Sequence, residues 1–335
     1  MGPCKTSTPL RDLLSFGAEV DLLDGTGATP LLLACNLGHA EVARALLSAG
    51  AKVDLVDNEG TSPLFMACQE GHVEAARVLL SAGATVDLPS NKGATPLFIA
   101  CQNGRAEAAR ALLSAGAKVD LQNQEGARPL SAACQEGHVE VARALLSFGA
   151  NADLLFQGVT TLYMACDRGD LDIVRTLLSA GAKVDLQDGD GLSPLSNACF
   201  HGHIRVVRAL LSAGASVDLQ GILGYSPLHT ACNRGHIKVV RALLSAGARA
   251  DLRDKSGMSW SGISWSCSGG SRQSHSEGSR GLSRGSWSCS GGSCQSLSEG
   301  SRGLSGGSWS SSGGSCQSLS EGFGGLSGGS CQDHS

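Results

Sequence analysis

The sequence has few aromatic residues, few charges and no long apolar stretch. Aromatic residues make up 4% of the 335 residues, charged residues make up 17%, and the formal net charge at pH 7 is -4. This near balance of charge argues against nucleic acid or an anionic membrane as a partner held by bulk electrostatic attraction. No apolar run approaches the roughly 20 residues that span a bilayer. The first ten residues also lack the apolar segment of a secretory signal peptide.

Residue patterns that would support catalysis or cofactor binding are also missing. The Gly-rich end of the chain lacks the strand and helix that flank a phosphate-binding loop. Glycine interrupts each cysteine–histidine pair, and Arg105 and Asp170 stand in the histidine position of two copies, so no catalytic base or metal ligand is expected. The pairs with a site-like spacing are Cys68 with His72, Cys134 with His138, and Cys232 with His236. We therefore expect no enzyme activity, cofactor or metal.

Seven of the 13 cysteines recur at one position of a sequence repeat. They follow one another at intervals of 33 residues, with one interval of 32, and are Cys35, Cys68, Cys101, Cys134, Cys166, Cys199 and Cys232. Stacked helices lie about 8–10 Å apart, whereas the α-carbons of a disulfide lie within about 7 Å. These cysteines are therefore predicted to be small apolar residues of a helix interface. Unpaired thiols indicate a reducing compartment, so we predict a cytoplasmic protein, with the nucleus left open.

A stretch of 33 residues, clearest at Gly60–Lys92, organises the chain. It returns from Gly93 and again from Gly126, and related copies begin at Gly27, Gly158, Gly191 and Gly224. A fixed period of this length is the signature of a stacked repeat protein, in which each copy buries its apolar face against its neighbours.

Each copy contains signals for two helices and a loop. Ser62 and Pro63 provide an N-cap and a first-turn proline, and Gly71 ends the first helix. A second helix begins near His72, and Gly83 supplies a left-handed residue at its end. The residues after Gly83 are expected to run out and turn back as a hairpin. The copy is thus predicted to be a helix, a short turn, a second helix and a protruding hairpin.

The repeated pattern G-x-T-P-L-x-x-A-C-x-x-G-H-x-E-V-x-x-L-L-x-x-G-A-x-V-D-L is similar to the ankyrin repeat. The resemblance implies an all-α solenoid of helix-turn-helix units with protruding β-hairpin loops. It covers residues 27–256, and residues 1–26 look like a partial N-terminal half repeat. The seven expected repeats are 27–59, 60–92, 93–125, 126–157, 158–190, 191–223 and 224–256.

Two departures from the ankyrin pattern are local. The histidine that usually follows Thr-Pro-Leu is present only as His229. The fourth copy is one residue short in its closing loop, and the fifth has Thr161 where proline is expected. The stack is therefore expected to bend or loosen at this point.

Residues 257–335 form a Ser/Gly-rich tail with a period of 22 residues of its own. Such a composition provides too little apolar surface to offset chain entropy, so the tail is predicted to be disordered. Its recurring tryptophans are consistent with short adhesive motifs. Recent copying of DNA, or read-through of a non-coding tract, explains the repetition equally well.

Positions that differ between copies lie at the loop tips and at the end of each first helix. In ankyrin-like stacks these positions line the concave groove, so the resemblance implies that they contact a partner. They are polar in the second to fourth copies and become apolar, aromatic or basic from the fourth loop onward, a composition typical of binding hot spots. The predicted partner-binding residues are Phe156, Arg168, Leu192, Phe200, His201, Ile222, Leu223, Tyr225 and Arg234.

The sequence thus predicts a non-catalytic scaffold or adaptor that binds an unidentified protein along the groove. No nucleic acid, membrane or small-molecule substrate is expected. Relaxed drift at exposed loop tips is the alternative explanation of the variable positions. A further alternative is that the chain is the binding fragment of a larger protein whose effector or catalytic module is absent, because the last copy lacks the polar outer face of a terminal cap.

Overall fold

A computed structural model describes residues 19–255 together with their side chains, and beyond them only the backbone of seven short strands. The chain divides into two compact units, residues 1–186 and residues 187–335. The helix predicted in the N-terminal half repeat lies outside the described residues.

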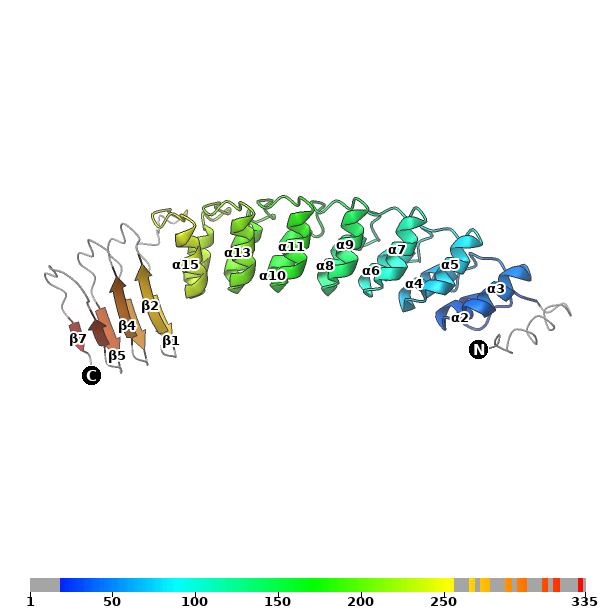
Figure 1. Cartoon of the computed structure of the whole chain (residues 1–335), viewed down its shortest axis with the longest axis horizontal. Helices are drawn as coiled ribbons and strands as arrows, with labels where there is room; N and C mark the ends of the chain where they lie inside the picture. The colour runs from blue at the N-terminus through cyan, green and yellow to red at the C-terminus, as the bar shows by residue number, and fades with distance from the viewer. Residues whose placement is uncertain are drawn as a thin grey trace. The chain divides into compact units, whose positions relative to one another are not determined.

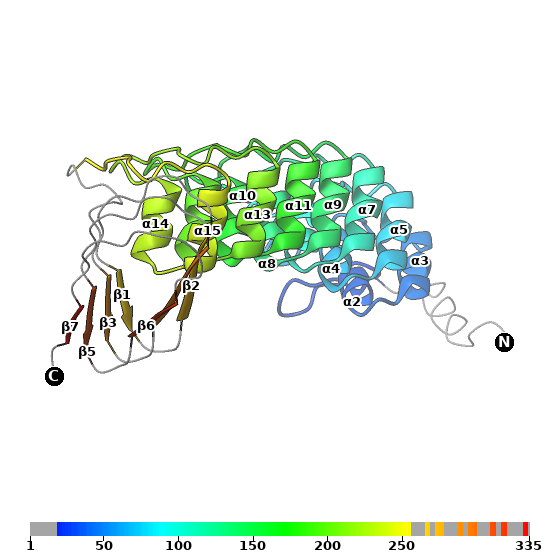
Figure 2. The same cartoon turned by 60° about the vertical axis from the view of Figure 1, so that its left-hand side comes forward.

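The described part of the first unit is a stack of helix pairs (Figure 1). Each first helix packs against the first helix of the next repeat, and each second helix packs against the next second helix, which gives two layers (Figure 2). The first helices are α2 (Pro30–Asn36), α4 (Pro63–Glu70), α6 (Pro96–Gln102), α8 (Pro129–Glu136) and α10 (Thr161–Arg168). The second helices are α3 (Ala40–Ser48), α5 (Val73–Ser81), α7 (Ala106–Ser114), α9 (Val139–Ser147) and α11 (Leu171–Ser179).

The second unit contains two helix pairs of the same design. Its first helices are α12 (Pro194–His201) and α14 (Pro227–Asn233), which pack against each other. Its second helices, α13 (Ile204–Ser212) and α15 (Ile237–Ser245), also pack against each other. The predicted all-α repeat fold is confirmed.

The first helices begin and end where the sequence predicts. In the second repeat, the Ser62 hydroxyl accepts a hydrogen bond of 3.1 Å from the amide of Phe65, and Pro63 occupies the first helical position. At the other end, Gly71 has a φ of 84°, in the left-handed region that favours glycine. The chain therefore leaves α4 sharply enough to return as the antiparallel α5.

Small residues allow the helices to approach closely. Leu64 and Leu79 are completely buried, and so are Ala67, Ala76 and Cys68. Burying a leucine side chain contributes about 1.5–3 kcal/mol, and the alanines keep the helix backbones near enough for the leucines to interlock. Because every repeat has these residue types in the same slots, each interface repeats the same packing.

The loops between repeats are turns. No strand is assigned between residues 19 and 255, where the single pair printed as a β-bridge joins Phe156 and Val159. The Asp57 carboxylate accepts hydrogen bonds from the amides of Glu59, at 2.9 Å, and Thr61, at 2.8 Å. The protruding loops are present, but a β-ladder within them is not, because the side chain of Asp57 satisfies the amides at the tip of the turn.

The fifth repeat keeps its first helix without proline. Thr160 caps α10 by accepting from the amide of Tyr163 at 3.2 Å. The buried Thr161 hydroxyl donates to the carbonyl oxygen of Ala152 at 2.8 Å. In the shortened loop before it, Gln157 takes a φ of 51°, which is uncommon for a non-glycine residue. The predicted bending or loosening here stays a prediction.

Aspartates tie each loop to the next repeat. The Asp54 carboxylate accepts from the amide of Thr85 at 3.1 Å, and Asp87 accepts from the amide of Lys118 at 3.2 Å. In the second unit, Asp218 accepts from the amide of Arg249 at 2.9 Å. These bonds satisfy amides that the turn leaves without a backbone partner. The aspartate of the V-D-L pattern therefore joins neighbouring repeats.

The seven repeat cysteines are free and buried. Burial raises the pKa of the Cys35 thiol to about 12. Burial, and to a smaller extent the neighbouring Cys35, raises the pKa of the Cys68 thiol to about 12 as well. The thiol and not the nucleophilic thiolate is therefore the stable form. The predicted role as small apolar residues of the helix interface agrees with this burial.

Seven short strands are described in the tail, all pairing in parallel. The 22-residue period brings equivalent residues into register, so that Trp265 is the partner of Trp287. The prediction of a disordered tail is not confirmed for these segments, and the rest of the tail lies outside the described residues. One sheet has the order β1 (Trp265–Ser268), β3 (Trp287–Ser290), β5 (Trp309–Ser312) and β7 (Cys331–Asp333). The other has the order β2 (Arg272–Glu277), β4 (Cys294–Glu299) and β6 (Cys316–Leu319).

Replacing Asp87 with alanine removes the acceptor for the Lys118 amide and should lower the free energy of unfolding by about 1 kcal/mol. Asp87→Asn keeps a side-chain oxygen and should lose less. Urea unfolding followed by circular dichroism measures both. Equal stability of the alanine variant and the unchanged protein would contradict the role of this bond.

The buried thiols should resist alkylation in the folded protein. At pH 8, a thiol with a pKa near 12 is ionised to only about one part in ten thousand, so iodoacetamide should leave the seven repeat cysteines unmodified for hours. In urea, all seven should react. Peptide mass spectrometry gives the extent at each residue, and rapid modification of Cys68 in the folded chain would show that this interface opens readily.

Candidate partner-binding surface

An aromatic ring and a guanidinium group lie together at the ends of the first helices of the second unit. Phe200 occupies the last turn of α12, and its side chain is 39% exposed. The Cζ atom of Arg234, at the end of α14, lies 3.6 Å from the centre of the Phe200 ring. This is cation–π geometry. The carbonyl oxygen of Phe200 also lies 3.0 Å from Nε2 of His236, so the next repeat holds the Phe200 backbone in place.

The loop tip between these repeats presents further apolar side chains. Ile222 is 52% exposed, Leu223 is 63% exposed, and Tyr225 is 42% exposed. Their backbone is ordered by the preceding loop, because the amide of Ile222 donates to the carbonyl oxygen of Asp190 at 2.9 Å. The side chains are thus displayed on a fixed loop.

Two other predicted residues lie beside this group. The ring of exposed His201 meets Phe200 edge-on, with 4.9 Å between the ring centres. Leu192 is half-buried, and its Cδ2 would be 3.1 Å from a Cβ placed on Gly221. Seven of the nine predicted residues therefore lie in the second unit, in contact with one another or on the same loop tips. We call this set the Phe200 surface, and it consists of Leu192, Phe200, His201, Ile222, Leu223, Tyr225 and Arg234.

The remaining two predicted residues belong to the first unit. Phe156 is half-buried and packs against the cluster that includes Phe65 and Phe98. Phe65 and Phe98 are themselves buried. Arg168 is exposed in the last turn of α10. The structure thus gives Phe156 a packing contact, and it leaves Arg168 on the surface of the first unit.

Polar residues at the corresponding positions of the first unit bind neighbouring repeats. The Asn103 side-chain amide donates to the carbonyl oxygen of Gln69 at 3.2 Å. The side-chain amide of Asn91 donates in the same way to the carbonyl oxygen of Asn58 at 3.1 Å. These positions therefore reinforce the stack in the first unit, whereas they present apolar and aromatic side chains in the second.

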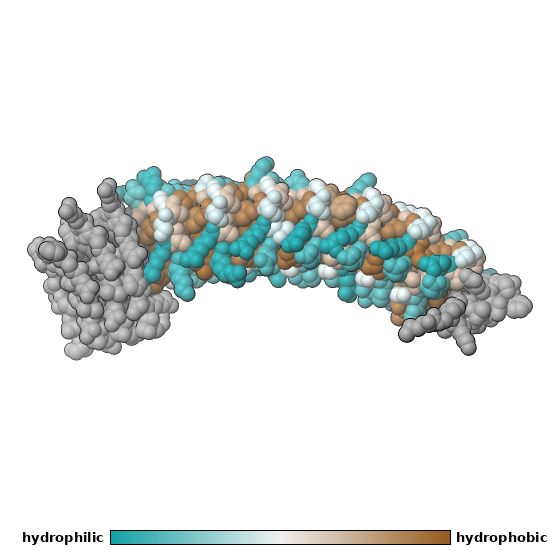
Figure 3. Space-filling model, viewed as in Figure 1, coloured by the Kyte–Doolittle hydropathy of each residue, from teal (hydrophilic) through white to brown (hydrophobic). Residues whose placement is uncertain are grey.

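A row of apolar residues on the first helices was missed from the sequence. Leu33 is exposed in α2, and Met66 and Ile99 are half-buried in α4 and α6. These three residues recur at intervals of 33, but the repeat pattern alone placed them in the core. Figure 3 shows one face of the molecule, on which hydrophilic side chains recur with hydrophobic ones between them.

The cysteine–histidine pairs are structural. The Nε2 atom of His72 lies 3.1 Å from the carbonyl oxygen of Asn36 in the preceding repeat, and His138 contacts Gln102 in the same way. The cysteine of each pair is buried. Within residues 19–255, no group of three or more His, Cys, Asp or Glu side chains has the arrangement of a metal site. The histidines therefore join repeats, and the pairs do not form a reactive centre.

In the described part of the chain, no helix has the length and apolar character to cross a membrane. The helices of both units have at most nine residues.

Comparisons with known proteins agree with this geometry. A family described as ankyrin repeats (3 copies) matches residues 5–90, 50–123, 82–154, 97–188 and 162–254. The crystal structure of the human ASB11 ankyrin repeat domain is similar with a TM-score of 0.58 and 34% identity, over 66% of this chain and 99% of that domain. The ankyrin repeat domain of Bcl-3, a member of the IkappaB protein family, is similar with a TM-score of 0.57 and 30% identity, over 61% of this chain and 94% of that domain.

No curated protein sequence matches the chain. Ankyrin repeat domains are in general protein–protein interaction modules. The matches to the family extend from residue 5 to residue 254, which is most of the sequence and includes every helix described above. The chain belongs to the ankyrin-repeat family.

Proposed function

We propose that this protein is a non-catalytic scaffold or adaptor that binds a protein partner through its first helices and loop tips. The Phe200 surface supplies the main anchor. The observation that carries this proposal is the exposed Phe200 ring beneath the Arg234 guanidinium group, bordered by the exposed loop residues Ile222 and Leu223.

Aromatic and arginine side chains dominate the binding energy of protein interfaces, because they bury a large area and lose few rotational states. The Phe200 surface combines both types on a backbone that is already ordered. The cation–π contact with Arg234 orients the two side chains before a partner arrives, which reduces the entropy lost on binding. Exposed apolar groups gathered in one place are typical of interaction sites.

Other features fit a binding role in a reducing compartment. The repeat thiols are free and buried, and burial disfavours the thiolate that a nucleophilic enzyme would need. We infer a cytoplasmic protein, with the nucleus left open, whose partner is a protein and not a small-molecule substrate, a nucleic acid or a membrane.

Replacing both Phe200 and Tyr225 with alanine should weaken partner binding at least tenfold, which corresponds to about 1.4 kcal/mol. Both side chains are exposed, so the helix content and the unfolding midpoint should change little. The full-length protein and the variant are used as bait in a reducing cell lysate, and quantitative mass spectrometry compares the retained proteins.

A matched control is Phe148→Ala, which removes an exposed phenylalanine from the end of α9 in the first unit. This control should retain the same proteins as the unchanged chain. If the Phe200 and Tyr225 variant retains them equally well, or if the control loses them too, the assignment of the Phe200 surface is wrong.

A further inference from the structure

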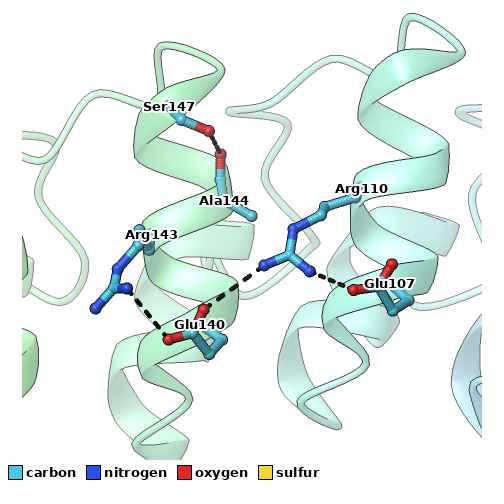
Figure 4. A network of polar contacts seen from close by, with 6 residues as sticks. All are labelled: Glu107, Arg110, Glu140, Arg143, Ala144 and Ser147. Carbon is cyan, nitrogen blue, oxygen red and sulfur yellow. Dashed lines mark hydrogen bonds and ion pairs between the residues drawn. The ribbon is translucent and has the colours of Figure 1, made fainter.

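The second helices of the first unit carry charges in matched pairs. Arg44 lies 2.6 Å from Glu41 on α3, and Arg77 lies 3.2 Å from Glu74 on α5. The pairs also connect neighbouring helices. In Figure 4, Arg110 contacts Glu107 on its own helix, α7, and reaches Glu140 on α9 at 3.6 Å. The acidic and basic side chains of this face therefore neutralise each other.

The second unit lacks the acidic half of this pattern. Arg205 on α13 and Lys238 on α15 occupy the position that glutamate holds in the first four repeats. Each is followed three residues later by an arginine, Arg208 or Arg241, and neither helix has an acidic residue in its first turn. Among the described residues, no carboxylate lies within ion-pair distance of Arg205, Arg208 or Lys238, and all three are exposed.

The basic side chains border an open groove between α13 and α15. Its volume is about 600 Å³, and its walls include Arg208, Lys238 and Arg241, with Leu211 and Ala242 as apolar lining. The corresponding groove between α3 and α5 has a volume of about 330 Å³. That groove is lined by Glu74 as well as by two arginines, Arg44 and Arg77. The same structural position is therefore charge-paired in the first unit and basic in the second.

We propose that this α13–α15 groove binds an acidic, extended segment of a partner protein. Adjacent packed helices lie about 8–10 Å apart, and an extended chain advances about 3.3 Å per residue. Carboxylates on every third residue of the segment would therefore face the cations of both helices. Arginine donates paired hydrogen bonds to a carboxylate, which adds geometric selectivity to the charge attraction.

The lining of the groove favours a peptide over other anions. Leu211 and Ala242 offer apolar surface that peptide side chains can cover, whereas a phosphodiester backbone has no apolar groups to bury there. Neither α13 nor α15 contains an aromatic residue on which a nucleic-acid base could stack. The valines of both helices are buried, so they are not available for insertion into a lipid surface.

This groove is separate from the Phe200 surface. Phe200 and Arg234 lie at the ends of the first helices, whereas the basic groove is formed by the second helices. The two surfaces would contact different parts of a partner, or two partners. A failure of one assignment therefore leaves the other intact.

The test uses the full-length protein and a fluorescein-labelled peptide of about 12 residues, with aspartate at every third position and serine or threonine between. Fluorescence anisotropy should show binding that weakens as salt increases, because exposed charges are screened. A peptide with asparagine in place of each aspartate should bind at least tenfold more weakly. Equal binding of the two peptides would overturn the proposal.

Variants exchange the charge patterns of the two units. Arg205→Glu combined with Lys238→Glu installs the glutamates found in the first four repeats, so the fold should tolerate it, and the affinity for the aspartate peptide should fall at least tenfold. Glu74→Arg combined with Glu107→Arg gives α5 and α7 of the first unit two arginines each and should create a second site. Unchanged affinity in the first variant, with circular dichroism showing a folded chain, would refute the assignment of the groove.

Two competing ligands complete the experiment. A duplex DNA of about 12 base pairs and vesicles containing phosphatidylserine test the other anions that a basic surface attracts. The proposal expects the aspartate peptide to compete with either one at lower concentration. If DNA or vesicles bind the unchanged protein more tightly than the peptide, and lose that binding in the Arg205→Glu, Lys238→Glu variant, the groove takes a different anion and the proposal fails.

Discussion

The structure depends on the burial of small and aliphatic side chains between neighbouring repeats. Leu64, Ala67 and Cys68 are fully buried, and their equivalents occupy the same slots in each copy. A single repeat has no other way to cover its apolar face, so neighbour contacts supply the stability of a stacked fold. Hydrogen bonds between successive loops, such as that from the Thr85 amide to Asp54, then fix the spacing of the loops. Substitutions are therefore constrained in the helix interfaces and much freer at the tips.

That division separates folding from binding. At the tips and helix ends of the first unit, Asn91 and Asn103 donate hydrogen bonds to neighbouring repeats. At the equivalent positions of the second unit, Ile222 and Arg234 are exposed and border Phe200 or its loop. A few changes on an unchanged backbone have thus converted positions that stabilise the stack into positions that can hold a partner. The exchange of glutamate for Arg205 and Lys238 on the second helices follows the same principle.

Most of the fold was predictable because local signals and the period agree. Ser62 caps its helix, Gly71 ends it, and the buried cysteines recur as expected. The side-chain environments were less predictable. Phe156 looked like an exposed anchor, but the turn of its shortened loop brings it against the first unit's aromatic cluster. The basic groove also depends on structure, since its charges become adjacent only when α13 packs on α15.

The central claim is that constant positions fix the stack and variable positions bind. The most direct measurement replaces five residues of the second unit with their counterparts from the third repeat: Phe200→Gln, Ile222→Gln, Leu223→Glu, Tyr225→Ala and Arg234→Asn. Urea unfolding and partner capture are then measured on the same protein. The account predicts an unfolding midpoint close to that of the unchanged chain together with lost capture. Retained capture, or a collapse of stability that accompanies its loss, would contradict it.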